Sequence, residues 1–170
     1  DKLAQAGVHS FKIEGRAKSA YYTAVTAGAY RAATDLMWQD PAHYICPEWL
    51  RDEEAKVTPR VYTTGFLFGP PENGQCYETG GYIRRWEVAG VVTGYDAEHR
   101  RLLCVQRNKF AAGQPLELVL PLRGVKAFTP EKLYNADGEP VDCVPHAAAP
   151  FMMDYPEPLP EGTLLRMAAD

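Results

Sequence analysis

Several patterns that identify common protein classes are absent from this sequence of 170 residues. It has only two serines, Ser10 and Ser19, and neither lies in the Gly-x-Ser-x-Gly turn that carries the nucleophile of many hydrolases. Its four cysteines form no CxxC pair and no Cys/His pair at metal-ligand spacing, so we expect free thiols and no metal site. No uncharged run approaches the roughly 20 apolar residues of a membrane span, and no signal-peptide pattern opens the chain. These absences argue against a serine protease or a membrane partner and favour a cytoplasmic protein.

Charge is distributed unevenly along the chain, although the net charge is only −4. Residues 84–127 carry eight basic and four acidic side chains, whereas residues 128–170 carry two and eight. The central block therefore either forms a basic patch or is an ordinary solvated surface of mixed charge. The sequence leaves both interpretations open.

Residues 1–45 alternate between helical and strand-like patterns. A short helix is expected over 3–6, closed by Gly7, and a strand over 8–14. A long helix is expected over 17–37, with Arg31 and Asp35 paired one turn apart on its polar face. Its apolar stripe comprises Tyr22, Val25, Ala29, Ala32, Ala33 and Leu36.

A single strand between two helices has no partner for its backbone N–H and C=O groups, and such groups are rarely left unpaired when buried. Alternation of helix and strand is typical of a (β/α) barrel or a doubly wound sheet, of which only one repeat is present. We therefore expect the chain to begin inside a domain, and residues 1–15 to be disordered, rearranged or paired with another segment. Residues 46–59 read as a linker, with a charged helix over 48–56.

Residues 60–170 show short strand patterns separated by turn signals, which predict a small antiparallel β-barrel or sandwich. Gly90 and Gly94 are expected to mark bulges or positions of close approach, and the proline-rich residues 145–160 are expected to form an extended strap. The expected strands are 60–68, 86–95, 101–107, 116–120, 125–129, 141–144 and 163–167.

Several motifs in order along the chain resemble one known family. Residues 10–22, SFKIEGRAKSAYY, and residues 30–35, YRAATD, resemble the signature of the collagenase-like peptidases of family U32. The second half resembles their carboxyl-terminal region in YTTGF (62–66), YIRR (82–85), VAGVV (88–92), QRNKF (106–110), Gly113 and the closing Leu165-Arg166. Ala17 is a mild departure, since a methionine is expected there.

The resemblance implies a (β/α) barrel followed by a β-barrel similar to the second domain of translation elongation factors. The predicted fold class is therefore α+β: a terminal strand and helix of the upstream barrel, then a small antiparallel β-barrel. Members are described either as proteases, including collagen-degrading ones, or as RNA-modifying enzymes, including prephenate-dependent hydroxylases of the tRNA wobble uridine. The resemblance places an iron–sulfur cluster and prephenate in the full-length parent, and neither in this fragment.

Lys12, Glu14, Arg16 and Lys18 form the first candidate site. At the carboxyl end of a barrel strand they would face the catalytic rim. Three cations and one carboxylate suit an anion such as a phosphate or a dicarboxylate, because a guanidinium can hold an oxyanion in two hydrogen bonds. A structural ion-pair network between strand and helix is the alternative interpretation.

The second candidate site lies in the basic central block. Single-stranded RNA binding needs cations for phosphates and aromatic faces for bases, and Trp86, Tyr95 and Phe110 are interleaved with cations here. The candidate RNA or substrate contacts are Arg84, Arg85, Arg107, Asn108 and Lys109.

Two functions follow for this segment. It is either a substrate-recognition module of a protease or of a tRNA wobble-uridine hydroxylase, inactive alone, or a domain that braces the catalytic barrel or a partner subunit. The expected partners are the upstream barrel of the same chain, tRNA or a protein substrate, and a paired homologous subunit. No residue of this segment is assignable as catalytic.

Overall fold

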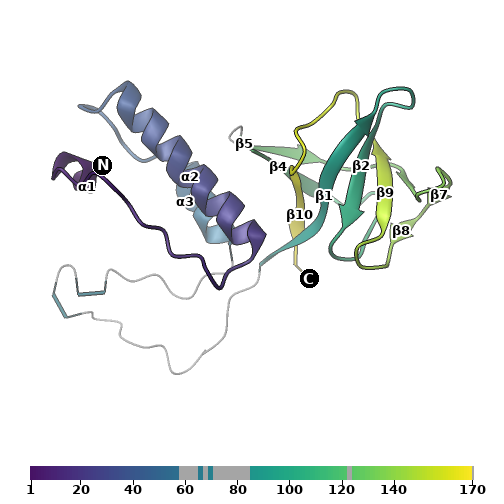
Figure 1. The fold of residues 1–170 in the computed structure, drawn as a ribbon, viewed down its shortest axis with the longest axis horizontal. Coiled ribbons are helices and arrows are strands. Elements are labelled where there is room, and N and C mark those ends of the chain that lie inside the picture. The colour runs from purple at the N-terminus through teal and green to yellow at the C-terminus, as the bar shows by residue number, and fades with distance from the viewer. Residues whose placement is uncertain (58–64, 67–68, 71–84, 122–123, 170) are drawn as a thin grey trace.

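The computed structural model describes residues 1–57, 65–66, 69–70, 85–121 and 124–169. A helical part formed by residues 1–57 lies beside a β domain formed by residues 85–169 (Figure 1). Most of the described regular structure is antiparallel sheet, with few helices. Among the described residues, no helix has the length and hydropathy needed to cross a membrane.

Three helices make up the first part. The short α1 (Lys2–Gln5) is followed by Gly7 at φ +82°, a conformation that glycine adopts without strain. Helix α2 (Ala20–Gln39) begins where the Ser19 hydroxyl accepts a hydrogen bond from the backbone N–H of Tyr22 at 3.2 Å. Helix α3 (Glu48–Lys56) runs beside α2, and the predicted Arg31–Asp35 ion pair is present on α2 (Figure 1).

The strand predicted over 8–14 is wrong: these residues form no regular structure and are exposed. The apolar side chains of Phe11 and Ile13 are 50% and 41% accessible to solvent. A strand forms only when a neighbour satisfies its backbone, and none of the described residues supplies one. Of the three expected states of residues 1–15, disordered, rearranged or paired with another segment, none is singled out by the exposed, irregular course of residues 8–14.

The β domain contains an eight-stranded antiparallel sheet in the order β5-β4-β10-β1-β2-β9-β6-β7 and a small sheet that pairs β3 with β8. Its strands are β1 (Trp86–Asp96), β2 (Arg101–Gln106), β3 (Phe110–Ala111), β4 (Leu116–Leu120), β5 (Gly124–Phe128), β6 (Leu133–Tyr134), β7 (Pro140–Val141), β8 (Cys143–Val144), β9 (Pro150–Asp154) and β10 (Leu164–Ala168). Similarity to a translation-factor barrel stays a prediction.

Most of the expected strands are observed within about two residues of their predicted ends. The strand expected over 141–144 is divided between β7 and β8, and β3 and β6 were not predicted. The strap expected over 145–160 contains β9, which pairs with both β2 and β6. The strand expected over 60–68 lies outside the described residues except for 65–66, which form a turn.

Both predicted bulges in β1 are confirmed. The register of β1 shifts at Gly90 against β10 and at Gly94 against β2. At Gly90 a side chain has no room, because a Cβ atom would lie 3.0 Å from the carbonyl oxygen of Val105 and 3.1 Å from the ring of Phe151. This close approach allows Phe151 to pack edge-to-face against Phe110 in the core of the β domain.

A second, smaller apolar cluster joins the helices to the sheet. Tyr21 and Val25 of α2, Val57 after α3 and Leu164 of β10 are buried together. Tyr21 is buried, whereas the predicted apolar stripe of α2 began at Tyr22. The buried face of α2 is therefore rotated from the predicted one. We call this contact region, between the start of α2, α3 and strands β1, β4 and β10, the joint.

Candidate functional site

A buried arginine lies at the centre of the joint. Arg166 of β10 has a fully buried side chain, and it donates hydrogen bonds of 2.7 Å to Glu117 Oε2 and to Glu53 Oε1. Lys56 Nζ donates to the same two carboxylates at 2.9 Å (Glu53) and 3.1 Å (Glu117). The Tyr21 hydroxyl accepts from Arg166 at 3.4 Å and donates to the backbone oxygen of Lys56 at 3.1 Å. We call these five residues the joint cluster.

The environment shifts the pKa values of three residues of this cluster. Burial disfavours the charged form of Glu53, but hydrogen bonds from Arg166 and Lys56 outweigh it, so the pKa of Glu53 is lowered. Burial raises the pKa of Tyr21. The pKa of Arg166 is raised because its carboxylate partners outweigh its burial. The charged forms of Glu53 and Arg166 are therefore favoured where the helices meet the sheet.

Trp86 completes the joint. The Arg166 guanidinium lies 5.1 Å from the centre of the Trp86 ring, and the Lys56 ammonium lies 4.9 Å from it. The sequence analysis named Arg166 only as part of a closing motif and missed the cluster. The arginine itself could have indicated the cluster, since a cation within the apolar strand LLRMA is buried only when it is paired.

The four residues of the first candidate site lie on the exposed segment before α2. Lys12 Nζ is 3.4 Å from Glu14 Oε2, and the Arg16 backbone N–H donates to Glu14 Oε1 at 2.9 Å. These two hydrogen bonds lower the pKa of Glu14. The Lys18 ammonium lies 5.6 Å from the centre of the Tyr22 ring. The structure thus brings Lys12, Glu14 and the Arg16 backbone together.

The second candidate site lies on both sides of the first residues of β1. On one side, Ala169 N–H donates to the Arg85 carbonyl at 2.8 Å. On the other side, Arg107 N–H donates to the Ala89 carbonyl at 2.8 Å, and Asn108 Nδ2 donates to the Val88 carbonyl at 2.8 Å. Asn108 is therefore a structural residue that fixes the turn after β2.

Three residues of the second candidate site are exposed cations. The side chains of Arg85, Arg107 and Lys109 are exposed, and the same end of the β domain carries all three. Arg84 lies outside the described residues. We call Arg85, Arg107 and Lys109 the basic edge.

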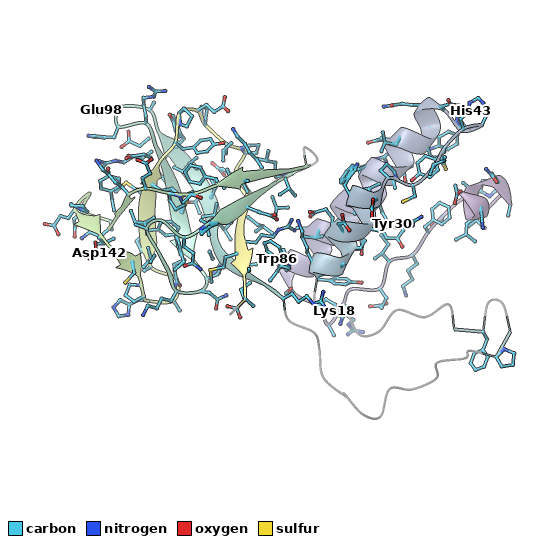
Figure 2. The ribbon with its side chains drawn as sticks, turned by 180° about the vertical axis from the view of Figure 1, so that it is seen from behind. Lys18, Tyr30, His43, Trp86, Glu98 and Asp142 are labelled. Carbon is cyan, nitrogen blue, oxygen red and sulfur yellow. The ribbon has the colours of Figure 1, made fainter. Side chains whose placement is uncertain are left out.

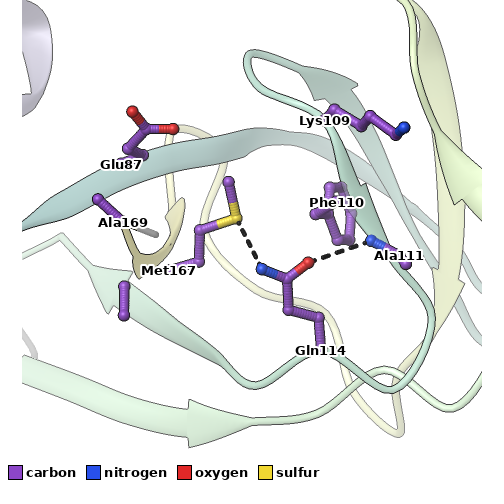
Figure 3. Close-up of a pocket in the computed structure, with 8 residues that line it drawn as sticks. Glu87, Lys109, Phe110, Ala111, Gln114, Met167 and Ala169 are labelled. Carbon is purple, nitrogen blue, oxygen red and sulfur yellow. Dashed lines mark hydrogen bonds between the residues drawn. The ribbon is translucent and has the colours of Figure 1, made fainter.

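A pocket opens beside the basic edge (Figure 3). Its cavity volume is about 320 Å³. The Gln114 side chain lies between Met167 and Ala111: its Nε2 donates to the Met167 sulfur at 3.3 Å, and its Oε1 accepts from the Ala111 N–H at 3.3 Å. The lining residues are Glu87, Lys109, Phe110, Ala111, Gln114, Met167, Ala168 and Ala169.

A residue close in sequence to each candidate site contacts Arg166 at the joint. Tyr21, three residues after Lys18, and Trp86, which follows Arg85, both contact Arg166. In Figure 2, Lys18 and Trp86 lie where the helices adjoin the β domain, whereas His43 and Asp142 lie at distant ends of the molecule.

The described residues do not fit an iron–sulfur centre. No group of three His, Cys, Asp or Glu side chains that could hold a metal ion occurs among them. Cys104 is buried in the core of the β domain, where burial raises the pKa of its thiol to about 12. Because a metal-binding cysteine is a thiolate, this thiol is unsuited to ligation.

Two family profiles match successive parts of the chain. The sequence profile of Peptidase family U32 matches residues 1–76, and that of the Peptidase family U32 C-terminal domain matches residues 84–166. The chain belongs to peptidase family U32. The resemblance identified from the sequence motifs is therefore confirmed.

Relatives with curated names extend over most of the chain. It is 35% identical over 161 residues to tRNA hydroxylation protein P of Escherichia coli, which covers 94% of this chain and 34% of that protein. It is 38% identical over 144 residues to tRNA hydroxylation protein P of Haemophilus influenzae, which covers 84% of this chain and 30% of that protein. The chain thus spans about a third of the length of these relatives.

A solved structure also resembles part of the chain. The C-terminal domain of a U32 family protein from Geobacillus thermoleovorans is 30% identical, with a TM-score of 0.44, over 47% of this chain and 98% of that domain.

Proposed function

We propose that this chain is the tRNA-contacting module of a U32 protein that takes part in tRNA hydroxylation. Support comes from the relatives named tRNA hydroxylation protein, whose similarity extends over both the helical part and the β domain. A protease module, as the family name suggests, is the competing function. The proposal implies a cytoplasmic location, since tRNA is modified there.

The observation that carries this proposal is the basic edge next to an open pocket. Arg85, Arg107 and Lys109 are exposed at one end of the β domain, where β1 is flanked by the end of β10 and the turn after β2. Cations on a fixed backbone bind phosphates, and an adjacent pocket can take a base. Arg16 and Lys18 lie on the segment before α2, and the joint holds Tyr21 of α2 against Arg166 of the β domain.

In this function the chain binds and positions RNA, and the chemistry takes place in the rest of the longer protein. Prephenate and an iron–sulfur cluster belong to that catalytic part in our proposal. Lys12, Arg16 and Lys18 would face it as contacts for an RNA phosphate or for a dicarboxylate, with Glu14 holding the segment through Lys12 and the Arg16 N–H.

The test is a titration of the chain with labelled tRNA at several salt concentrations. Each phosphate contact contributes about 0.7 to 0.9 to the slope of log K against log salt concentration. We expect R107A and K109A each to weaken binding and to reduce the slope by about one contact. K132A is the matched control, because Lys132 is an exposed lysine beside β6, on the far side of β9 from these cations.

Absence of tRNA binding at low salt would contradict the proposal. So would an equal loss of affinity in K132A, since that result would indicate nonspecific attraction. Binding of a collagen peptide in preference to tRNA would favour the protease module.

A bracing role is the second candidate, favoured by the distribution of exposed apolar side chains. Among the described residues, large exposed hydrophobics are concentrated before residue 50, including Trp38 at 67%, Ile45 at 83% and Trp49 at 47% accessibility. Exposed apolar surface of this kind marks an interaction site. We propose that the remainder of the longer protein, including its upstream barrel, covers it, with the joint holding the helices to the β domain.

Hydroxyl-radical footprinting tests this second role. Trp38 and Trp49 should react less in the longer protein than in this chain alone. Equal reactivity would contradict coverage by the rest of the protein, and concentration-dependent dimerisation of this chain would indicate a paired subunit instead.

A further inference from the structure

The pocket beside the basic edge has features that suit one small, flat, polar ligand. Its cavity of about 320 Å³ lies at the low end of the size range of small-molecule sites. Phe110, which is only 2% accessible, and the thioether of Met167 contribute to its lining, and the amide of Gln114 lies between Met167 and Ala111 (Figure 3). The carboxylate of Glu87 and the ammonium of Lys109 also line the pocket, so the lining combines apolar atoms, one amide and two opposite charges.

Gln114 supplies both a donor and an acceptor. Its two hydrogen bonds, to the Met167 sulfur and from the Ala111 N–H, are both 3.3 Å long. Bonds of this length are weak, and sulfur is a poor acceptor, so the amide loses little when it turns to a better partner. An amide pairs well with the edge of a nucleobase, which presents a donor and an acceptor side by side.

The cations at the pocket fit the phosphates of a nucleotide chain. Lys109 lines the pocket opposite in charge to Glu87, and Arg107, two residues before Lys109, is exposed outside it. A base in the pocket would leave its phosphates at the level of these two cations. Hydrogen bonds to a base edge together with phosphate contacts are one way in which proteins bind unpaired bases.

We infer that this pocket holds one unpaired base of the RNA, with the flanking phosphates on Arg107 and Lys109. This inference rests on the proposed function and adds to it a specific base-binding site. A protein side chain as the occupant is the alternative, and the experiment separates the two.

The test fills the pocket without changing its charge. Ala111 lines the pocket and is exposed on β3, so A111L places a larger side chain in the cavity. The matched control is A127L, since Ala127 is also an exposed strand alanine, on β5 and outside the pocket lining. The probes are single-stranded hexauridine RNA and the same hexamer with abasic riboses, measured by fluorescence anisotropy.

The unmodified chain should bind hexauridine at least fivefold more tightly than the abasic hexamer, as expected for one base edge paired with an amide. A111L should reduce this preference to less than twofold while keeping the salt dependence, and A127L should keep the preference. Q114L should also reduce it, because the amide is lost. Thermal unfolding of each variant must first show that it is folded.

The outcomes distinguish the inference from the proposed function. Equal binding of the two hexamers by the unmodified chain, or a full preference in A111L, would overturn the base pocket while RNA binding stands. Failure to bind tRNA and either hexamer would overturn the proposed function itself.

Discussion

Replacing Arg166 with methionine tests whether the joint cluster holds the helices to the β domain. The change removes a fully buried guanidinium and keeps an unbranched side chain in β10. It breaks two hydrogen bonds of 2.7 Å, to Glu53 and Glu117. Loss of one partner from a buried ion pair costs about 3–5 kcal/mol, because the other charge stays buried.

The geometry places the expected cost at the lower end of that range. Lys56 still contacts both carboxylates, at 2.9 and 3.1 Å, and the side chains of Glu53 and Glu117 are 12% and 24% accessible. Their charges are therefore partly compensated after the change. We expect R166M to lower the free energy of unfolding by about 3 kcal/mol at pH 7.

Urea unfolding followed by circular dichroism measures this difference. The control is R31A, which removes the exposed Arg31–Asp35 pair and should cost little, because an exposed ion pair contributes little to stability. In a double-mutant cycle, E53Q should cost less in the R166M background than in the native one. A cost for R166M no larger than that for R31A, or a cycle with no coupling, would refute the reasoning.

The pH dependence of the same experiment has a defined sign. The pKa of Glu53 is lowered in the folded chain from an ordinary value of 4.5. Its stabilising contribution is therefore complete well above pH 4.5 and is lost as the pH falls through the lowered folded value. The difference between the native chain and R166M should shrink below pH 4.5.

Three further predictions concern other parts of the fold. G90A should destabilise by about 1–3 kcal/mol, because its Cβ would meet Val105 and Phe151, whereas G28A in α2 has open space and should stabilise by up to about 1 kcal/mol; equal effects in urea unfolding would contradict this. Burial, and then the nearby Glu53, raise the pKa of Glu54, so E54Q should increase stability at pH 7 with the gain vanishing below pH 4.5. A gain that persists at pH 4 would contradict that cause. Cys104, with a thiol pKa of about 12, should resist iodoacetamide at pH 8 until the chain unfolds, as mass spectrometry would show.

Local patterns were sufficient to predict the elements whose stability is local. Helix α2 has a serine cap and a helical apolar stripe, and strands such as β1 and β10 have β-forming residues between turn signals. The bulges at Gly90 and Gly94 followed from glycine within a strand pattern.

Elements that depend on distant partners could not be predicted in the same way. The segment 8–14 has a strand pattern but no partner among the described residues, so the pattern alone did not produce a strand. Strand β9 lies in the proline-rich segment and was not predicted. Its Phe151 and Met153 nevertheless alternate into the core, opposite Cys104 and Leu102 of β2.

The candidate site shows the same limit. The sequence identified Arg85, Arg107 and Lys109 as cations of one block, but their common position depends on the pairing of β1 with β10 and the turn after β2. The contact between Arg166 and Glu53 spans 113 residues, so no local pattern could have indicated it.

The joint connects the two functions that the sequence left as alternatives. Arg166 is fully buried and cannot touch RNA, yet it contacts both Trp86, the neighbour of Arg85, and Tyr21, three residues after Lys18. The helices cannot shift along the sheet without separating buried charges, which costs several kcal/mol. The cluster that braces the helical part therefore also fixes Tyr21, at the start of α2, relative to Trp86, which follows Arg85. Bracing and RNA binding are thus compatible roles, since a preorganised arrangement of cations loses less entropy when it binds phosphates.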